Sequence, residues 1–70
     1  NFRMEYRFKN SMDELAGVNE RIEPFLEGCG CEMECCYAVT LAIEELVTNI
    51  IKYGYDDAAE HEILLRLTDE

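Results

Sequence analysis

The sequence lacks any long hydrophobic run and is poor in basic residues. No apolar stretch approaches the roughly 20 residues that a membrane-spanning helix needs. Six Lys and Arg stand against 16 Asp and Glu, which gives a formal net charge of −10. Because phosphate backbones are bound by clustered Lys and Arg, this balance argues against a nucleic-acid partner and disfavours an anionic membrane surface. It does not exclude a nucleotide, whose phosphates can be held by Mg²⁺ and backbone amides.

Residues 2–9 alternate charged and apolar side chains and contain no hydrophobic block, so we expect no signal peptide. Without a secretory signal we expect a cytoplasmic protein whose four cysteines are free thiols. Seventy residues make one small domain at most, and such a chain buries only about 60% of the surface of its unfolded form. The apolar fraction of 49% is that of a globular chain.

Two stretches show the period of two that is typical of strands. Residues 2–9 alternate strictly, and residues 62–68 place Ile63, Leu65 and Leu67 on one face. The chain then reads T-D-E, which resembles the start of a hairpin turn. Because a pair of strands is only marginally stable, we expect a continuation of the chain or a second chain to complete the sheet.

Between the strands, two stretches show helical spacing. The first follows a capping box formed by Ser11 and Glu14, Pro24 should kink or end it, and Gly28 is the expected stop. The second is predicted from about Met33 to Tyr53. The order strand, helix, helix, strand predicts an α+β fold.

A polar stripe runs along the second predicted helix. At about 100° per residue, polar side chains at i, i+3, i+4 and i+7 share one face: Glu45, Thr48, Asn49 and Lys52. Asn and Thr are mediocre helix formers, so helix stability does not explain them. A carboxylate can accept a proton from a hydroxyl, an amide oxygen suits Mg²⁺, and an ammonium can meet a phosphate. The stripe therefore suits phosphoryl transfer, although a solvated helix face gives the same pattern.

These residues lie in L-A-I-E-E-L-V-T-N-I-I-K-Y-G-Y, residues 41–55, which resembles the N-box of the GHKL ATPase superfamily that includes the histidine kinases. The likeness is nearest to the anti-sigma-factor branch, bacterial serine/threonine kinases that inhibit sigma factors. In that branch a helix carries E-x-x-x-N, a basic residue and an aromatic–Gly pair, matched here by Glu45, Asn49, Lys52, Tyr53 and Gly54. With the order of the elements, the resemblance covers essentially the whole chain.

The resemblance implies a role for each position. Asn49 would coordinate the Mg²⁺ that bridges the ATP phosphates, and Glu45 would be the general base facing the attacking hydroxyl. Lys52 would lie beside the phosphates, and Tyr53 near the nucleotide. Glu44 falls about 100° from the stripe and is therefore not chosen as the base. The implied cofactors are ATP and Mg²⁺, and the implied partners are a sigma factor or an antagonist protein, with a homodimer as the assembly.

The resemblance also implies the N-terminal half of a GHKL-type α/β sandwich, with the helices on one face of the sheet. The D-x-G-x-G motif that binds adenine and the Gly-rich lid do not occur in residues 1–70, and no Gly follows Asp69. We therefore interpret residues 1–70 as the N-box half of an ATPase domain and expect this half alone to be inactive. The alternative is a non-catalytic acidic module that dimerises or binds a protein through an exposed strand edge.

Four cysteines within eight residues raise the question of a metal or redox site: Cys29, Cys31, Cys35 and Cys36. Their C-x-C-x3-C-C spacing fits poorly with the paired C-x2-C of structural zinc sites, which favours half-buried thiols at the start of a helix. A zinc site and a redox pair remain alternatives. His61, the single histidine, is expected in a solvated loop before the second strand.

Overall fold

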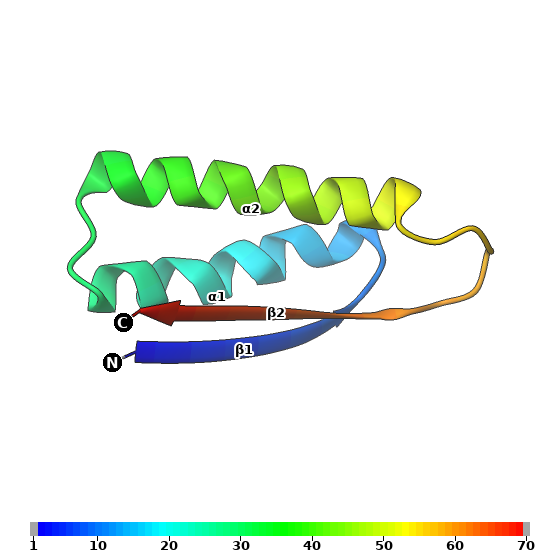
Figure 1. The fold of residues 1–70 in the computed structure, drawn as a ribbon, viewed down its shortest axis with the longest axis horizontal. Helices are drawn as coiled ribbons and strands as arrows, with labels where there is room; N and C mark the ends of the chain where they lie inside the picture. The colour runs from blue at the N-terminus through cyan, green and yellow to red at the C-terminus, as the bar shows by residue number, and fades with distance from the viewer. Residues whose placement is uncertain (1, 70) are drawn as a thin grey trace.

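The computed structural model describes residues 2–69, and within them the predicted order of strand, helix, helix and strand is confirmed (Figure 1). The elements are strand β1 (Phe2–Lys9), a 3-10 turn (Met12–Glu14), helix α1 (Leu15–Gly28), helix α2 (Met33–Tyr53) and strand β2 (Glu62–Asp69). The strands pair antiparallel in a two-stranded sheet, and both helices lie on one side of it (Figure 1). The fold is therefore α+β, as the sequence predicts.

The register of the sheet places apolar side chains opposite one another on the face toward the helices. The pairs on this face are Phe8 with Ile63, Tyr6 with Leu65 and Met4 with Leu67. Asp69 continues β2 and pairs with Phe2, so the expectation that a hairpin turn starts here is wrong at this residue. Glu70 lies outside the described residues.

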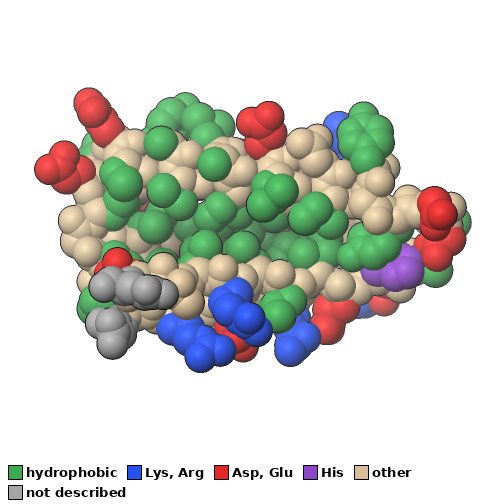
Figure 2. Space-filling model, in the orientation of Figure 1, with side chains coloured by type: hydrophobic (Ala, Val, Ile, Leu, Met, Phe, Trp, Pro, Cys, Tyr) green, Lys and Arg blue, Asp and Glu red, His purple; other side chains and the backbone are tan. Residues whose placement is uncertain are grey.

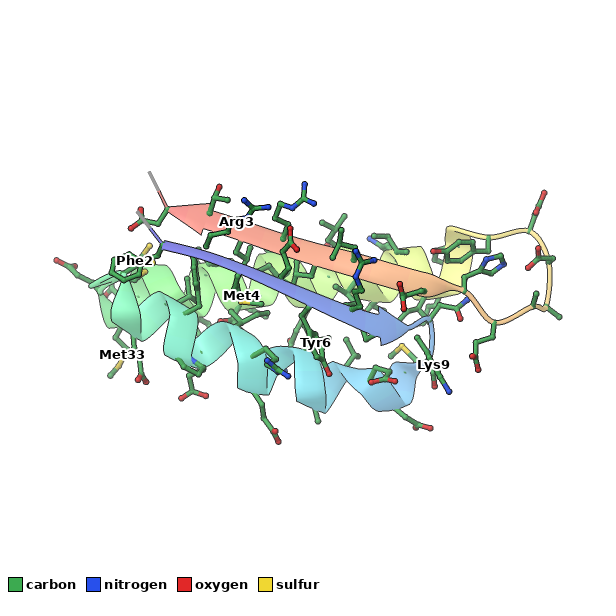
Figure 3. The ribbon with its side chains drawn as sticks, turned by 90° about the horizontal axis from the view of Figure 1, so that it is seen from below. Phe2, Arg3, Met4, Tyr6, Lys9 and Met33 are labelled. Atoms are coloured by element: carbon green, nitrogen blue, oxygen red, sulfur yellow. The ribbon has the colours of Figure 1, made fainter. Side chains whose placement is uncertain are left out.

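Helix α1 packs against both β1 and α2, and it carries the centre of the core. Its side chains Val18 and Ile22 are both 0% exposed. The other buried apolar side chains surround them from all four elements: Phe8, Leu26, Ile43, Val47 and Ile63. Tyr6 extends over α1 (Figure 3), where the Arg21 guanidinium lies 4.9 Å from the centre of its ring. The core is therefore a single cluster that depends on α1.

The outer face of the sheet carries ion pairs. The carboxylate of Glu5 accepts hydrogen bonds from Arg66 at 2.7 Å on the opposite strand and from Arg3 at 3.0 Å. Arg7 and Glu62 form a second cross-strand pair at 3.2 Å. The hydrogen bonds from Arg3 and Arg66 lower the pKa of Glu5 from its ordinary value of 4.5. Since these groups are exposed, each pair stabilises the sheet only modestly.

The start of α1 differs from the predicted capping box. The Ser11 hydroxyl accepts a hydrogen bond from the backbone N–H of Asp13 at 3.4 Å, and a 3-10 turn precedes the α-helix. Among residues 2–69 no return bond from the Glu14 side chain is present. Ser11 caps the turn, but the reciprocal half of the capping box does not form.

Pro24 neither ends α1 nor marks its last turn, because the helix continues to Gly28. Proline lacks the N–H that would bond the carbonyl of Glu20. Both residues are exposed, so water can satisfy that carbonyl. Of the two effects predicted for Pro24, a kink or an end, the end does not occur, since solvent removes most of the penalty on which it rests.

Gly28 is the last residue of α1, as expected, but Gly30 makes the turn. Gly30 has φ +74°, a left-handed conformation that favours glycine. Its N–H bonds the Glu27 carbonyl at 3.1 Å, and the N–H of Cys31 bonds the Leu26 carbonyl at 3.2 Å. These two bonds define a Schellman motif, with Gly30 at the left-handed position.

The loop before β2 is more ordered than the solvated loop predicted for His61. The His61 ring is half-buried, stacks on Tyr55 at 4.0 Å between ring centres, and lies 2.7 Å from the Asp57 carboxylate. The backbone of His61 also exchanges hydrogen bonds with Asn10 after β1. These hydrogen bonds hold the loop against the end of the sheet. Within residues 2–69, neither helix is long and apolar enough to cross a membrane.

Glu5→Gln should weaken the acid dependence of stability. A carboxylate with a lowered pKa stabilises the fold above its unfolded pKa near 4.5, and this contribution is lost as the pH falls through the lower folded value. Urea unfolding midpoints at about pH 3 and about pH 6 should differ less in Glu5→Gln than in the unsubstituted chain. Glu34→Gln, an exposed carboxylate on α2, is the control and should keep the original difference. Equal pH dependence in both variants would contradict the role of Glu5.

Candidate functional site

The predicted stripe lies on the face of α2 opposite its buried side chains. Ile43 and Val47 point into the core at 8% and 2% exposure. On the outer side, Glu45 and Asn49 are exposed, and Thr48 is half-buried. Within residues 2–69, the Glu45 and Asn49 side chains form no hydrogen bond or ion pair. Their functional groups are therefore available to a ligand.

Glu45, Thr48 and Asn49 line one shallow groove together with Leu41 and Glu44. Its volume is about 280 Å³, and it is open to solvent. The structure thus brings together the carboxylate and the amide that the sequence selects. It does not bring Lys52 and Tyr53 into this groove. Both are exposed further along α2, and the Tyr53 side chain is 78% exposed.

Sequence reasoning missed the contact that ties this groove to α1. The side-chain amide of Asn19 donates a hydrogen bond of 2.6 Å to the Glu44 carboxylate, and the contact is partly buried. The offset of Glu44 from the stripe excluded it as a base, yet the same offset turns it toward α1. The available signal was Asn19 itself, a polar residue at the helical spacing of the core side chains Val18 and Ile22.

Asn19 has an unpaired acceptor as well. Its Oδ1 atom is buried and has no hydrogen-bond partner within the described residues. A buried acceptor without a donor is unfavourable, so the bond to Glu44 must offset part of that cost. Asn19 and Glu44 therefore act as a positioning pair that fixes one wall of the groove.

The glycine of the K-Y-G-Y stretch has a steric role. Gly54 donates its N–H to the Ile50 carbonyl at 2.8 Å, and a Cβ atom at Gly54 would lie 2.6 Å from that same oxygen. Real Cβ atoms essentially never approach so closely, so a larger residue would shift the end of α2. Gly54 therefore lets the chain leave the helix directly after Tyr53.

The oxygen ligands in the groove fit Mg²⁺ better than they fit a nucleoside. A carboxylate, an amide and a hydroxyl are hard oxygen donors, and Mg²⁺ commonly uses one or two protein ligands together with phosphate and water. Ligand sites of drug-like size usually have volumes of about 300 to 1,000 Å³ and enclose the ligand. The groove is smaller and open, so it offers ligands for a metal ion without enclosing a purine.

The cysteines do not form a metal site in the described part of the chain. No group of three or more His, Cys, Asp or Glu side chains within residues 2–69 could hold a metal ion. Cys29, Cys31 and Cys36 are half-buried free thiols, as favoured from the sequence, whereas Cys35 is exposed.

A comparison with protein families assigns this chain to a class. The model of the histidine kinase-like ATPase domain matches residues 8–70. The chain belongs to this family, which supports the predicted GHKL relationship and implies ATP binding. Comparisons with curated proteins and with solved structures gave no match.

Asn19→Ala should destabilise the fold, because it leaves the partly buried Glu44 carboxylate without its donor. We expect a loss of about 1–3 kcal/mol in the free energy of unfolding, measured by urea titration. Glu20→Ala, at an exposed neighbouring position, is the control and should change stability by less than about 0.5 kcal/mol. A double-mutant cycle with Glu44→Gln should give a coupling energy above about 0.5 kcal/mol. Strict additivity would show that the pair is not coupled.

Proposed function

We propose that this chain is the N-box half of an ATP-dependent serine/threonine protein kinase of the anti-sigma-factor type. The observation that carries the proposal is the groove on α2, where Glu45 and Asn49 lie side by side, exposed, in a chain of the histidine kinase-like ATPase family. Phosphoryl transfer needs positioned phosphates, neutralised charge and a group that orients the nucleophile. The groove offers groups for each of these needs.

Each residue has a defined task in this proposal. The amide oxygen of Asn49 would hold Mg²⁺, and the bound ion would neutralise the charge of the ATP phosphates. The Glu45 carboxylate accepts the proton of a Ser or Thr hydroxyl on the substrate protein. Tyr53, exposed at the end of α2, contributes a surface beside the nucleotide.

Lys52 supplies a positive charge that the rest of the fold does not use. Arg3, Arg7, Lys9 and Arg66 form ion pairs with carboxylates, and Arg21 stacks on Tyr6. Within residues 2–69, Lys52 is the one remaining basic side chain, and it has no such partner. An ammonium one turn beyond Asn49 supports phosphate binding in a chain of net charge −10.

The proposed partners are a sigma factor and an antagonist protein that is phosphorylated on Ser or Thr, with the kinase acting as a cytoplasmic homodimer. We expect neither nucleic acid nor a membrane as a partner, because of the acidic balance of the chain. The D-x-G-x-G motif and the Gly-rich lid do not occur in residues 1–70. We therefore expect no kinase activity from this half of the domain alone.

In the intact protein, Asn49→Ala should weaken Mg·ATP binding about tenfold or more, which corresponds to about 1.4 kcal/mol for one lost ligand. Calorimetric titration measures this change. Glu45→Gln should instead leave the Kd for Mg·ATP nearly unchanged and lower the rate of phosphorylation of a protein substrate about 10²-fold or more. Glu34→Gln, three turns earlier on the same face of α2, is the matched control and should change neither quantity. Unchanged affinity in Asn49→Ala would remove Asn49 from the site.

An apolar band favours the alternative function, a non-catalytic dimerisation module. Val39, Ile43, Leu46 and Ile50 recur at i, i+4, i+7 and i+11 and share one face of α2. Apolar side chains fill the space between α2 and β2 on the visible face of the molecule (Figure 2). Leu46 is 58% exposed there, and β2 has a neighbouring strand on one side only within residues 2–69. An exposed apolar patch beside a free strand edge is typical of an interface.

Leu46→Glu should reduce dimerisation if this band binds a second copy of the chain. Sedimentation velocity over a concentration series should show a dimer for the unsubstituted protein and a monomer for the variant. Ala38→Glu, at an exposed position of α2 away from the band, should remain dimeric. A dimer without saturable Mg·ATP binding would support the alternative, and a monomer at every concentration would reject it.

A further inference from the structure

The turn between α1 and α2 holds four thiols that the proposed kinase site does not use. Cys29 and Cys31 lie in the turn, and Cys35 and Cys36 lie in the first turns of α2. All four are free thiols. The four thiols differ in their exposure and in their neighbouring groups, and these differences favour one pair.

The Schellman motif fixes the position of Cys31. Its N–H bonds the Leu26 carbonyl at 3.2 Å, which holds the residue against the end of α1. Helix α2 begins two residues later, and the N–H of Cys36 bonds the Glu32 carbonyl at 2.8 Å. Cys31 is therefore held by backbone hydrogen bonds beside the first turn of α2.

Cys31 lines a cavity of about 360 Å³ with Cys29 and Cys35, between the end of α1, the start of α2 and the end of β2. It lines a second cavity, of about 350 Å³, with Cys36. The neighbouring thiols of Cys35 and then Cys36 raise the pKa of Cys31 to about 12. Cys31 therefore has two neighbouring thiols, Cys35 and Cys36, and these two differ in exposure and in hydrogen bonding.

The other two thiols have different partners. Cys36 donates its S–H to the backbone carbonyl of Cys31 at 3.3 Å, so this thiol is already engaged in a hydrogen bond. Cys29 is partly buried beside the Asp69 carboxylate at the end of β2, and burial and then Asp69 raise its pKa. Cys35 alone of the four is exposed, so it is the thiol that a soluble oxidant meets first.

We propose that Cys31 and Cys35 form a reversible disulfide by exchange with a low-molecular-weight disulfide such as oxidised glutathione. The Cys35 thiolate attacks one glutathione sulfur, forms a mixed disulfide and releases one glutathione thiolate. Cys31 then attacks the Cys35 sulfur, forms the intramolecular bond and releases the second glutathione. The two thiols lose two protons and two electrons, and these reduce one oxidised glutathione to two reduced molecules.

This disulfide closes a ring of five residues across the junction between the helices. Glu32, the residue before α2, lies inside the ring. The bond therefore restrains the start of the helix that carries Glu45 and Asn49, without touching either residue. The inference does not depend on the kinase proposal, because the thiols and the groove lie at different parts of α2.

The test is disulfide mapping of the intact protein after incubation with oxidised glutathione and alkylation of the remaining thiols. Cleavage after glutamate places Cys29 and Cys31 in the peptide 28–32, and Cys35 and Cys36 in the peptide 35–44. The expected product is these two peptides joined by one disulfide, with separation after reduction. A disulfide within either peptide, a glutathione adduct that persists on Cys35, or four alkylated thiols would overturn the proposal.

Serine variants assign the bond to individual residues. Cys31→Ser and Cys35→Ser should each abolish the linked peptides, whereas Cys29→Ser and Cys36→Ser should retain them. Serine is close to cysteine in size, and circular dichroism checks that each variant is folded. Loss of the link in Cys36→Ser with retention in Cys35→Ser would assign the bond to Cys36 and contradict the proposal.

Discussion

The burial of Val18 and Ile22 on α1 is the constraint on which the rest of the structure depends. Both side chains are fully buried, because α1 packs against β1 and against α2. Apolar side chains of the sheet and Ile43 and Val47 of α2 complete the cluster around them. Helix α2 buries Ile43 and Val47 in this cluster, so only part of its circumference is needed for folding.

The remainder of α2 divides into two surfaces with different properties. One is apolar, faces the space beside β2, and includes the exposed Leu46. The other is polar and carries Glu45 and Asn49 in an open groove. Asn and Thr are mediocre helix formers, and Asn49 is exposed rather than part of the core. The binding role proposed above accounts for both residues, and membership of an ATPase family supports that proposal.

The elements with a strong period were predictable, and the contacts between elements were not. The alternation of apolar and charged residues predicted β1 with its observed bounds. The helical spacing of apolar residues predicted α2 as Met33–Tyr53. The preference for glycine at helix ends correctly predicted that a glycine terminates α1. However, Gly30 rather than Gly28 adopts the left-handed conformation. The periodicity of apolar residues along one helix does not predict the angle at which that helix packs against another. The bond between Asn19 and Glu44 therefore needed the structure, and Glu44 could be excluded from the stripe while still lining the groove.

The distribution of charge links the sheet to the proposed site. The chain has six basic residues for 16 acidic ones, and four of the six form ion pairs that involve carboxylates on or next to the strands. These pairs hold the outer face of a sheet that has only two strands within residues 2–69. A triphosphate that approaches α2 therefore meets Lys52 as the nearby cation and Glu45 as a repelling anion. In the proposed function a divalent cation would offset this repulsion, and an amide ligand such as Asn49 would hold it without adding further negative charge.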